Sequence, residues 1–533
     1  MKAEREARAA PRGWHFIAHR SSFIVAFVLG ACTVLGFAPF SLFVVPPFTL
    51  AVLLLLWQRA GTGRGGAVIG FAYGLGLFLC GVSWVYVSLH DFGAMPALLA
   101  AFATVLFCAF LALFPALAGY LYAKAPFAAG IKLGLFFPAA WTLLEWTRGW
   151  LFTGFPWLAF GYSQIPASPL AGYAPVLGIY GVSLATVVSA GLAAVLWIQF
   201  RPADAREGIR AEGSSRGRAA FSLIAHPSFL VLLALWAGGW GLKQIEWTHP
   251  VGEPVAVSLL QGNVPQDLKW RDDRVQATLE DYRALAQSSA SRLIIFPETA
   301  LPLFLDNVPE DYLAGLAAHA RNNGGDMLIG VPERLPDGQY YNSVISVGTA
   351  PSQRYHKVHL VPFGEFIPLR PMLGGIVGAL AIPLQDFSRG TKHPQPLDVA
   401  GQRVAVNICY EDAFGEEIIR QLPQATLLVN VSNVAWFGRS IAPQQHLQIS
   451  QARALESGRY MLRATNTGVT AVIGPRGEVV KSAPEFARAV VSYLVPGFQG
   501  STPYVRWGNY AVLALAVALI AVAFLIHGLR ARS

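Results

Sequence analysis

The chain has 533 residues, of which 54% are hydrophobic and only 13% are charged, and its formal net charge is +9. Because about a quarter of the residues of an ordinary soluble protein are charged, this composition excludes a wholly soluble enzyme and predicts membrane segments. The positive charge does not indicate nucleic acid as a partner, since the lysines and arginines gather in 1–20, 59–64, 124–132, 201–218 and 530–532, beside apolar runs.

Long apolar runs fill the first half of the chain and return near its C-terminus. A bilayer core of about 30 Å needs roughly 20 apolar residues in a helix. The runs therefore predict about eight transmembrane spans, at 21–38, 42–57, 67–89, 95–122, 133–151, 178–200, 221–242 and 509–526. A cleaved signal peptide is not expected, because further spans follow the first one and Ala38-Pro39-Phe40 is a poor cleavage site.

The distribution of basic residues predicts the orientation of these spans. Positively charged loops remain in the cytoplasm. We therefore expect five parts: a cytoplasmic basic N-terminus (1–20), a membrane domain of seven spans (21–242), an extracytoplasmic domain (243–508), an eighth span (509–526) and a cytoplasmic C-terminus (527–533).

From Pro254 onward, short β-rich runs alternate with amphipathic stretches. The predicted strands are Val255–Leu260, Arg292–Phe296, Met327–Val331, Ser343–Val347, Arg403–Ile408, Thr426–Val431 and Val469–Ile473. The predicted helices are Gln276–Ser289, Pro309–Asn322 and Gln444–Arg463. This alternation is typical of an α/β sandwich and not of a β-barrel.

Three residues with useful chemistry stand at the ends of such runs or beside them. Glu298 follows the apolar run Ile294-Ile295-Phe296-Pro297, Lys357 stands among apolar and aromatic neighbours, and Cys409 ends the alternating run Arg403–Ile408. Taken singly, each has an ordinary interpretation: a solvated strand-end glutamate, a surface lysine and a buried structural cysteine. The other cysteines, Cys32, Cys80 and Cys108, lie inside apolar runs and are expected to be inert.

Together, the three residues predict a nucleophilic site. A thiol needs a base to become a thiolate, and acyl transfer needs a positive or N–H donor for the tetrahedral oxygen. A glutamate, a lysine and a cysteine supply these parts, and no histidine is as well placed for them.

The motifs around these residues resemble a known family. The order Pro297-Glu298, then His356-Lys357 with Leu360-Val361-Pro362-Phe363-Gly364-Glu365, then Cys409-Tyr410-Glu411 resembles the nitrilase (carbon–nitrogen hydrolase) superfamily. The sequence of 357–368, together with 261–270, 432–438 and the eight spans, is similar to the apolipoprotein N-acyltransferase family in particular. The resemblance covers essentially the whole chain and implies a nitrilase-like αββα sandwich.

The resemblance also implies an activity and a location. Cys409 would take an acyl chain from a phospholipid, usually phosphatidylethanolamine, as a thioester. It would pass this chain to the α-amino group of the diacylglyceryl-cysteine that begins an apolipoprotein, the last step of lipoprotein maturation. The enzyme would lie in the bacterial inner membrane with its catalytic domain on the periplasmic side, and it would need neither a metal nor a cofactor.

The same resemblance gives roles to individual residues. Glu298 would be the general base, and Lys357 would stabilise the oxyanion together with the Tyr410 N–H. Glu365 and Glu411 would orient Lys357 and the nucleophile.

Further expectations concern lipid contacts and one unusual position. Candidates for a substrate site or lipid entrance are the side chains Trp157, Trp270, Asn342, Trp436 and Phe437. An aromatic belt at the membrane surface is an equal interpretation of the stretch 154–162 around Trp157. Glu145 and Arg148, three residues apart in an apolar run, are expected to pair at the membrane edge. Val434 stands where the family pattern has Asp, which questions the geometry of the loop beside the nucleophile.

Two other functions fit parts of this pattern. A membrane-bound amidase or nitrilase would use the same triad with water as the acceptor, but a mere tether needs one span and not eight. A transporter with an extracytoplasmic sensor domain would be expected to show two related halves with broken or charged spans. Neither feature is evident in the sequence.

Overall fold

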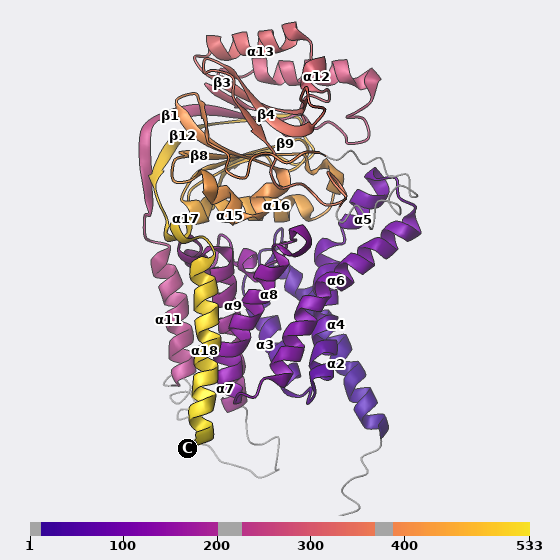
Figure 1. Ribbon diagram of the computed structural model, residues 1–533, viewed down its shortest axis with the longest axis vertical. Coiled ribbons are helices and arrows are strands. Elements are labelled where there is room, and N and C mark those ends of the chain that lie inside the picture. The colour runs from indigo at the N-terminus through magenta and orange to yellow at the C-terminus, as the bar shows by residue number, and fades with distance from the viewer. Residues whose placement is uncertain (1–11, 201–225, 368–386, 533) are drawn as a thin grey trace, which may run out of the picture.

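The computed structural model describes residues 12–200, 226–367 and 387–532, with backbone only for 12–20. It has two parts, a bundle of helices and, at one end of the bundle, a body of strands and helices (Figure 1). We call them the helical region (12–242 and 510–532) and the sandwich (248–500). The basic segment expected at 201–218 lies wholly outside the described residues, as do the first eleven residues.

The helical region is built from apolar helices of unequal length. Its main helices are α2 (Arg12–Thr33), α3 (Val45–Gln58), α4 (Gly63–Val82), α6 (Ala97–Lys124), α8 (Phe137–Arg148), α9 (Ala174–Phe200), α11 (Pro227–Leu242) and α18 (Tyr510–Arg532). Among the described residues, four helical stretches are long and apolar enough to cross a membrane: Gly63–Val82, Ala97–Lys124, Pro169–Phe200 and Tyr510–Arg532. Three apolar stretches are shorter: Ser21–Gly36, Val45–Gln58 and Pro227–Leu242.

Several predicted boundaries differ from the observed ones. Helix α2 begins at Arg12, so the boundary expected at residue 20 lies inside a helix. Helix α18 continues to Arg532, beyond the end expected at 526. The span expected at 133–151 is helical over 129–148 and contains the π-helical turn Lys132–Phe136. Apolar content locates such helices, but capping and local hydrogen bonds determine where they end.

Helices α2, α4 and α6 pack closely because glycines let their backbones approach. A Cβ atom on Gly66 of α4 would lie 2.3 Å from the carbonyl oxygen of Gly119 in α6, and one on Gly119 would lie 2.2 Å from that of Gly66. A Cβ atom on Gly30 of α2 would lie 1.9 Å from the carbonyl oxygen of Tyr73 in α4. Small residues at helix contacts are the usual packing device where lipid surrounds a bundle.

The sandwich contains two six-stranded sheets. The first has the order β12-β1-β2-β3-β4-β5 and the second has the order β11-β10-β9-β8-β7-β6. The strands are β1 (Thr248–Gln261), β2 (Leu293–Ile295), β3 (Asp326–Arg334), β4 (Tyr340–Gly348), β5 (Arg354–His356), β6 (Leu397–Val399), β7 (Gln402–Ile408), β8 (Leu427–Ser432), β9 (Met461–Thr465), β10 (Ala471–Ile473), β11 (Val479–Ser482) and β12 (Ala489–Gly500). The long strands β1 and β12 pair antiparallel from Thr248↔Gly500 to Gln261↔Ala489.

The layers are arranged αββα, as the resemblance implied. Alternate residues such as Val257 of β1 and Val406 of β7 point into one apolar core between the sheets. Helices α12 (Asp272–Gln287) and α13 (Glu310–Asn322) cover the first sheet, while α15 (Gly415–Ile418) and α16 (Ala442–Ser457) lie on the second (Figure 1).

Helix α16 lies between the second sheet and the helical region. Nearly all of its residues are buried, although many are polar. The prediction that this helix reaches Arg463 was wrong. Gly458, in the left-handed conformation at φ +63°, ends the helix, and Met461–Thr465 forms β9.

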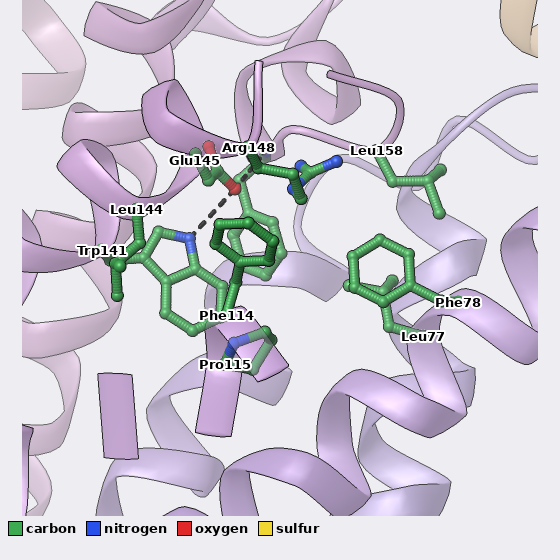
Figure 2. A pocket seen from close by; sticks show the side chains of 10 residues that line it. Leu77, Phe78, Phe114, Pro115, Trp141, Leu144, Glu145, Arg148 and Leu158 are labelled. Atoms are coloured by element: carbon green, nitrogen blue, oxygen red, sulfur yellow. Dashed lines mark hydrogen bonds between the residues drawn. The ribbon is translucent and has the colours of Figure 1, made fainter. Parts of the chain in front are cut away.

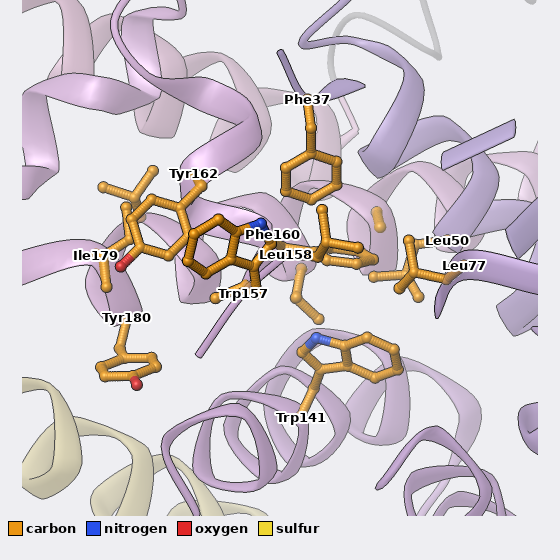
Figure 3. Close-up of a cluster of buried hydrophobic side chains, with 14 of the residues drawn as sticks. Phe37, Leu50, Leu77, Trp141, Trp157, Leu158, Phe160, Tyr162, Ile179 and Tyr180 are labelled. Carbon is orange, nitrogen blue, oxygen red and sulfur yellow. The ribbon is translucent and has the colours of Figure 1, made fainter. Parts of the chain in front are cut away.

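The two parts of the molecule share one apolar cluster. Tyr410, Phe414 and Ile449 of the sandwich belong to the same buried cluster as Trp141 and Phe160 of the helical region. Figure 3 shows the helical side of this cluster, in which aromatic rings from separate segments face one another. The sandwich therefore packs directly on the helices and is more than tethered to them.

Candidate active site

Cys409 stands at a sharp turn after a buried strand. Strand β7 ends at Ile408, and the 3₁₀ turn Cys409–Ala413 follows at once. Cys409 has φ +55°, a conformation that costs a non-glycine residue free energy and that recurs at functional sites. Its carbonyl oxygen accepts hydrogen bonds from Asn430 Nδ2 at 3.1 Å and from His446 Nε2 at 3.2 Å. These contacts fix the position of the Cys409 carbonyl group in the turn.

Glu298 follows β2 and is buried. Its two oxygens have separate partners: Asn342 Nδ2 donates to Oε1 at 2.8 Å, and the backbone N–H of Asn433 donates to Oε2 at 2.7 Å. The Lys357 ammonium lies 3.6 Å from Oε1. The carboxylate is therefore fixed in orientation and paired with a cation.

Lys357 follows β5 and is also buried. Its Nζ donates to Glu365 at 2.9 Å, and its backbone N–H donates to the carbonyl oxygen of Asn342 at 2.9 Å. The Asn342 amide also donates to Glu365 at 3.1 Å. Asn342, expected at a substrate or lipid entrance, thus belongs to the cluster that joins the two glutamates.

The pKa values of Cys409, Glu298 and Lys357 are not all shifted in the same direction. Burial raises the pKa of the Cys409 thiol, and the Glu298 carboxylate adds to this rise. Burial would raise the pKa of Glu298 as well, but the Lys357 ammonium and the Asn342 amide outweigh it, so that the pKa is lowered. Burial opposes the charge on Lys357, yet Glu365 and Glu298 raise its pKa. The resting site is a neutral thiol beside a charged glutamate–lysine pair.

Glu411 joins the Cys409 turn to the segment after Lys357. Its carboxylate accepts hydrogen bonds from the backbone N–H groups of Val358 (2.6 Å), His359 (3.0 Å) and Ile408 (2.7 Å), and from the Tyr355 hydroxyl (2.8 Å). Burial raises the pKa of Glu411 to about 7, and these donors act against the rise. Through this one side chain, the positions of Cys409 and Lys357 depend on each other.

A second lysine, Lys269, was not predicted. It is buried beside Glu298: its Nζ donates to the carbonyl oxygen of that residue (3.3 Å) and to the Thr299 hydroxyl (2.5 Å). Burial lowers its pKa to about 8, while Glu298 and Cys409 act in the other direction. The sequence offered one signal, its place beside Trp270 in the family-like stretch 261–270.

A buried polar network behind Cys409 was also missed. Asp412 Oδ1 lies 2.7 Å from His446 Nε2, and the Arg463 guanidinium donates to Asp412 (3.3 Å) and Asn430 (2.7 Å). These residues come from separate elements (the turn after β7, β8, α16 and β9), so no local pattern connects them. The network supports the residues that hold the Cys409 carbonyl.

The loop after β8 carries the unusual valine. The backbone N–H that binds Glu298 belongs to Asn433, and Val434 follows it, buried, at the start of the turn Val434–Phe437. The contact to Glu298 is therefore made by the backbone, although an apolar side chain stands where the resemblance places a carboxylate.

The aromatic candidates occupy different places. Trp270 is 51% exposed, and Trp436 is exposed with its ring edge-on to Phe92 of the helical region, at a centroid distance of 6.4 Å. Phe437 packs edge-on against Trp84 at 4.7 Å. Trp157, expected at a lipid entrance, is instead only 2% exposed, because it stacks on Tyr410 with a centroid distance of 6.3 Å.

Glu145 and Arg148 lie near the end of α8 that faces the sandwich. Figure 2 shows them at one end of a small cavity among α4, α6 and α8, with the Trp141 indole N–H donating to Glu145 at 3.0 Å. The cavity has a volume of ≈ 20 Å³, which is enough for about one water molecule. Within the described residues, no group of three or more His, Cys, Asp or Glu side chains is arranged to hold a metal ion.

Comparison with known proteins places this site in a family. Residues 29–192 match the apolipoprotein N-acyltransferase N-terminal domain, and residues 256–497 match the carbon-nitrogen hydrolase family. The apolipoprotein N-acyltransferase of Nitrosomonas europaea is 55% identical over 93% of this chain and 96% of its own length. That of Methylococcus capsulatus is 44% identical over 94% of this chain and 95% of its own length.

Among solved structures, an amidase from Nesterenkonia sp. is similar over 49% of this chain and 96% of its own, with 17% identity and a TM-score of 0.36. The identity and coverage of the two acyltransferases decide the assignment. This chain is an N-acyltransferase and belongs to the apolipoprotein N-acyltransferase family.

Proposed function

We propose that this enzyme transfers an acyl chain from a phospholipid, with phosphatidylethanolamine as the expected donor, to Cys409 as a thioester. It then transfers the acyl chain from Cys409 to the N-terminal amine of an apolipoprotein. The observation that carries this proposal is the half-buried Cys409 thiol at a strained turn beside the paired Glu298 and Lys357. Such a thiol needs a base only when it attacks, and the base is already ionised and oriented.

In the first half of the reaction, Cys409 Sγ attacks the ester carbonyl carbon while Glu298 takes the thiol proton. The Lys357 ammonium and the Tyr410 N–H hold the oxyanion of the tetrahedral intermediate. When the C–O bond breaks, Glu298 returns the proton to the leaving oxygen and a lysophospholipid departs. The products of this half are the Cys409 thioester and a neutral leaving group.

In the second half, the α-amino group of the diacylglyceryl-cysteine attacks the thioester. Glu298 takes a proton from the amine as the C–N bond forms, and it returns this proton to Cys409 as the C–S bond breaks. Glu365 keeps Lys357 charged, and Glu411 holds the two segments of the site together. Thiolates leave easily, which suits a thioester as the intermediate for amide formation.

Mass spectrometry of the purified full chain after exposure to phosphatidylethanolamine vesicles tests the first half. We expect an acyl adduct on the peptide that contains Cys409 and no adduct in Cys409→Ser. Cys80→Ser removes an exposed thiol of the helical region and should leave the adduct unchanged. An adduct that persists in Cys409→Ser, or that never forms in the wild type, would overturn the proposal.

Adding an apolipoprotein peptide to the isolated acyl-enzyme tests the second half. The thioester should disappear as N-acylated peptide forms. Discharge to water at the same rate, without N-acylated peptide, would favour the hydrolase alternative.

We further propose eight spans in the bacterial inner membrane, with 243–508 on the periplasmic side and both ends of the chain in the cytoplasm. In support, the basic end of α18 lies at the far end of the helical region from the sandwich (Figure 1). Arg59 and Arg64 lie at the connection of α3 and α4, and Lys124 ends α6, as expected for cytoplasmic loops.

Labelling of intact cells with a membrane-impermeant thiol reagent tests this orientation. Asp337→Cys, in the turn between β3 and β4, should react before the inner membrane is permeabilised, and Arg59→Cys should react only afterwards. The parent chain gives the background of the natural cysteines. The reverse pattern would exclude the periplasmic assignment.

A further inference from the structure

The connection that follows α8 has an unusual backbone. Phe152, Thr153 and Gly154 have consecutive positive φ angles of 52°, 78° and 85°. For side chains other than glycine this conformation costs free energy, so it persists only where surrounding contacts impose it. A Cβ atom on Gly154 would lie 2.0 Å from the carbonyl oxygen of Gly149, which shows how tightly the segment is folded. We call residues 152–157 the clamp loop.

Arg148 holds the clamp loop from within the helical region. Its Nη1 donates to the carbonyl oxygens of Phe155 (2.5 Å) and Trp157 (2.6 Å), and its own carbonyl oxygen accepts from the Phe155 N–H at 2.8 Å. Glu145, one turn earlier in α8, accepts from the Phe160 N–H at 3.0 Å. These contacts fix the loop at its middle and just beyond its end.

The clamp loop presents two neighbouring carbonyl groups to the active site. The Gly154 oxygen accepts from the Tyr410 hydroxyl at 2.9 Å, and the Thr153 oxygen lies 2.9 Å from His359 Nε2. Tyr410 directly follows Cys409, and His359 stands two residues after Lys357. The loop therefore contacts both segments that carry the reacting groups.

Trp157 adds a second contact to the nucleophile turn. Its indole stacks on Tyr410, at an angle of 16°, and packs against His446, the residue that contacts the Cys409 carbonyl. Its N–H donates to Gln445 of α16 at 2.8 Å. The clamp loop therefore contacts both the ring and the hydroxyl of Tyr410.

We propose that Arg148 is a positioning residue of the active site: it keeps the clamp loop in the shape that places Tyr410 and His359, and through them Cys409 and Lys357. This inference rests on Cys409 being the nucleophile of the proposed function. Arg148 is only 4% exposed, so we expect it to affect the reaction by holding the loop and not by binding a lipid head group.

Arg148→Met tests the proposal, with Arg148→Lys as the conservative change. An arginine fork donates to two carbonyls at once, whereas a lysine offers a single point charge, so Arg148→Lys should rescue only in part. We expect Arg148→Met to slow Cys409 adduct formation by about 10²-fold, the order that small misplacements of reacting groups cost. The KM for phospholipid should change far less than this rate.

Arg459→Met is the matched control. Arg459 is buried in the sandwich and donates to the carbonyl oxygens of Ala425 and Gly500, at 2.9 Å each, without contacting the clamp loop or the reacting residues. It should lower the melting temperature and leave the rate of adduct formation nearly unchanged. A wild-type rate in Arg148→Met, or a rise in KM alone, would overturn the proposal.

A double-mutant cycle separates positioning from general destabilisation. Tyr410→Phe removes the hydrogen bond to Gly154 and keeps the ring. If Arg148 acts through that contact, Arg148→Met with Tyr410→Phe should lose much less than the product of the two single losses. Multiplicative losses would refute the coupling.

If Arg148→Met does not fold, Arg148→Lys takes its place in the cycle, since it keeps the positive charge but lacks the fork that donates to the carbonyl oxygens of Phe155 and Trp157. The expected outcome and the outcome that would refute the coupling are the same as in the first cycle. In each experiment the wild-type adduct on Cys409 is measured alongside, so that failure of the proposed function is recognised separately from failure of the clamp.

Discussion

The helical region and the sandwich contain similar apolar side chains but place them oppositely. In the helical region large apolar residues cover the outside: Leu98 is 89% exposed and Leu525 is 63% exposed. In the sandwich such residues fill the space between the sheets, where Val257 and Val406 are fully buried. The difference indicates two solvents, since outward apolar surface on this scale is stable in lipid and would aggregate in water.

The two regions also hold together by different means. The sandwich gains stability by removing apolar surface from water. Helices in lipid lack that gain and depend on close backbone contact, as at Gly66 and Gly119. Buried charges differ in the same way: the sandwich holds a dense set around Cys409, whereas in the helical region Glu145 and Arg148 are each buried and bind backbone groups of the segment 155–160.

The strongest test of this comparison removes buried charges from the sandwich. Glu298→Gln and Lys357→Ala should each slow adduct formation by about 10²–10⁴-fold, because the base and an oxyanion donor are both needed when the ester is attacked. Time-resolved mass spectrometry of the Cys409 peptide measures this rate, and circular dichroism should show an intact fold. Normal adduct formation followed by failure only on adding apolipoprotein would restrict that residue to the second half-reaction.

A smaller effect is expected from a single methyl group in the helical region. Gly119→Ala should lower stability by about 3 kcal/mol, since the new Cβ atom collides with the Gly66 carbonyl and neither backbone can yield cheaply. Gly528→Ala in α18, where nothing lies within 4 Å of the new atom, is the control and should be neutral or slightly stabilising. The melting temperatures of the two variants and the wild type, measured in the same detergent, give the comparison. Equal effects of the two changes would contradict packing by close backbone approach.

The smallest effect concerns pH and the buried Lys269. Its pKa of about 8 lies below the ordinary lysine value, so at higher pH the folded protein releases a proton that the unfolded chain still holds. Wild-type stability should therefore rise relative to Lys269→Met as pH increases from 7 to 9.5, by about 2 kcal/mol. Paired thermal melts at the two pH values measure the difference. Lys481→Met, which removes an exposed lysine, is the control for the loss of a positive charge. A wild-type stability that falls relative to Lys269→Met as pH increases would refute the lowered pKa.

The sequence predicts the ends of the catalytic strands well, because these depend on local patterns. The run before Glu298 and the alternation before Cys409 both appear as buried strands followed by turns. The end of α16 was missed although Gly458 is a visible stop signal, because the apolar pattern continues past it into β9.

Features that depend on contacts between distant segments could not be predicted. The Tyr410 hydroxyl meets the Gly154 carbonyl across 256 positions of the chain. His446 and Arg463 approach Asp412 from a helix and a strand that also lie far along the sequence. Each of these residues has an ordinary local setting, so only the folded structure reveals its place.

The pairing of β1 with β12 has a consequence for how this architecture is assembled. Helix α11 leads to β1, α18 follows β12, and the first and last residues of this strand pair, Thr248 and Gly500, are register partners. The sandwich therefore enters and leaves the helical region at one place, as a loop would. A domain with adjacent ends can be inserted into another protein without stretching either, and here a complete αββα fold occupies the position of a connection between two helices.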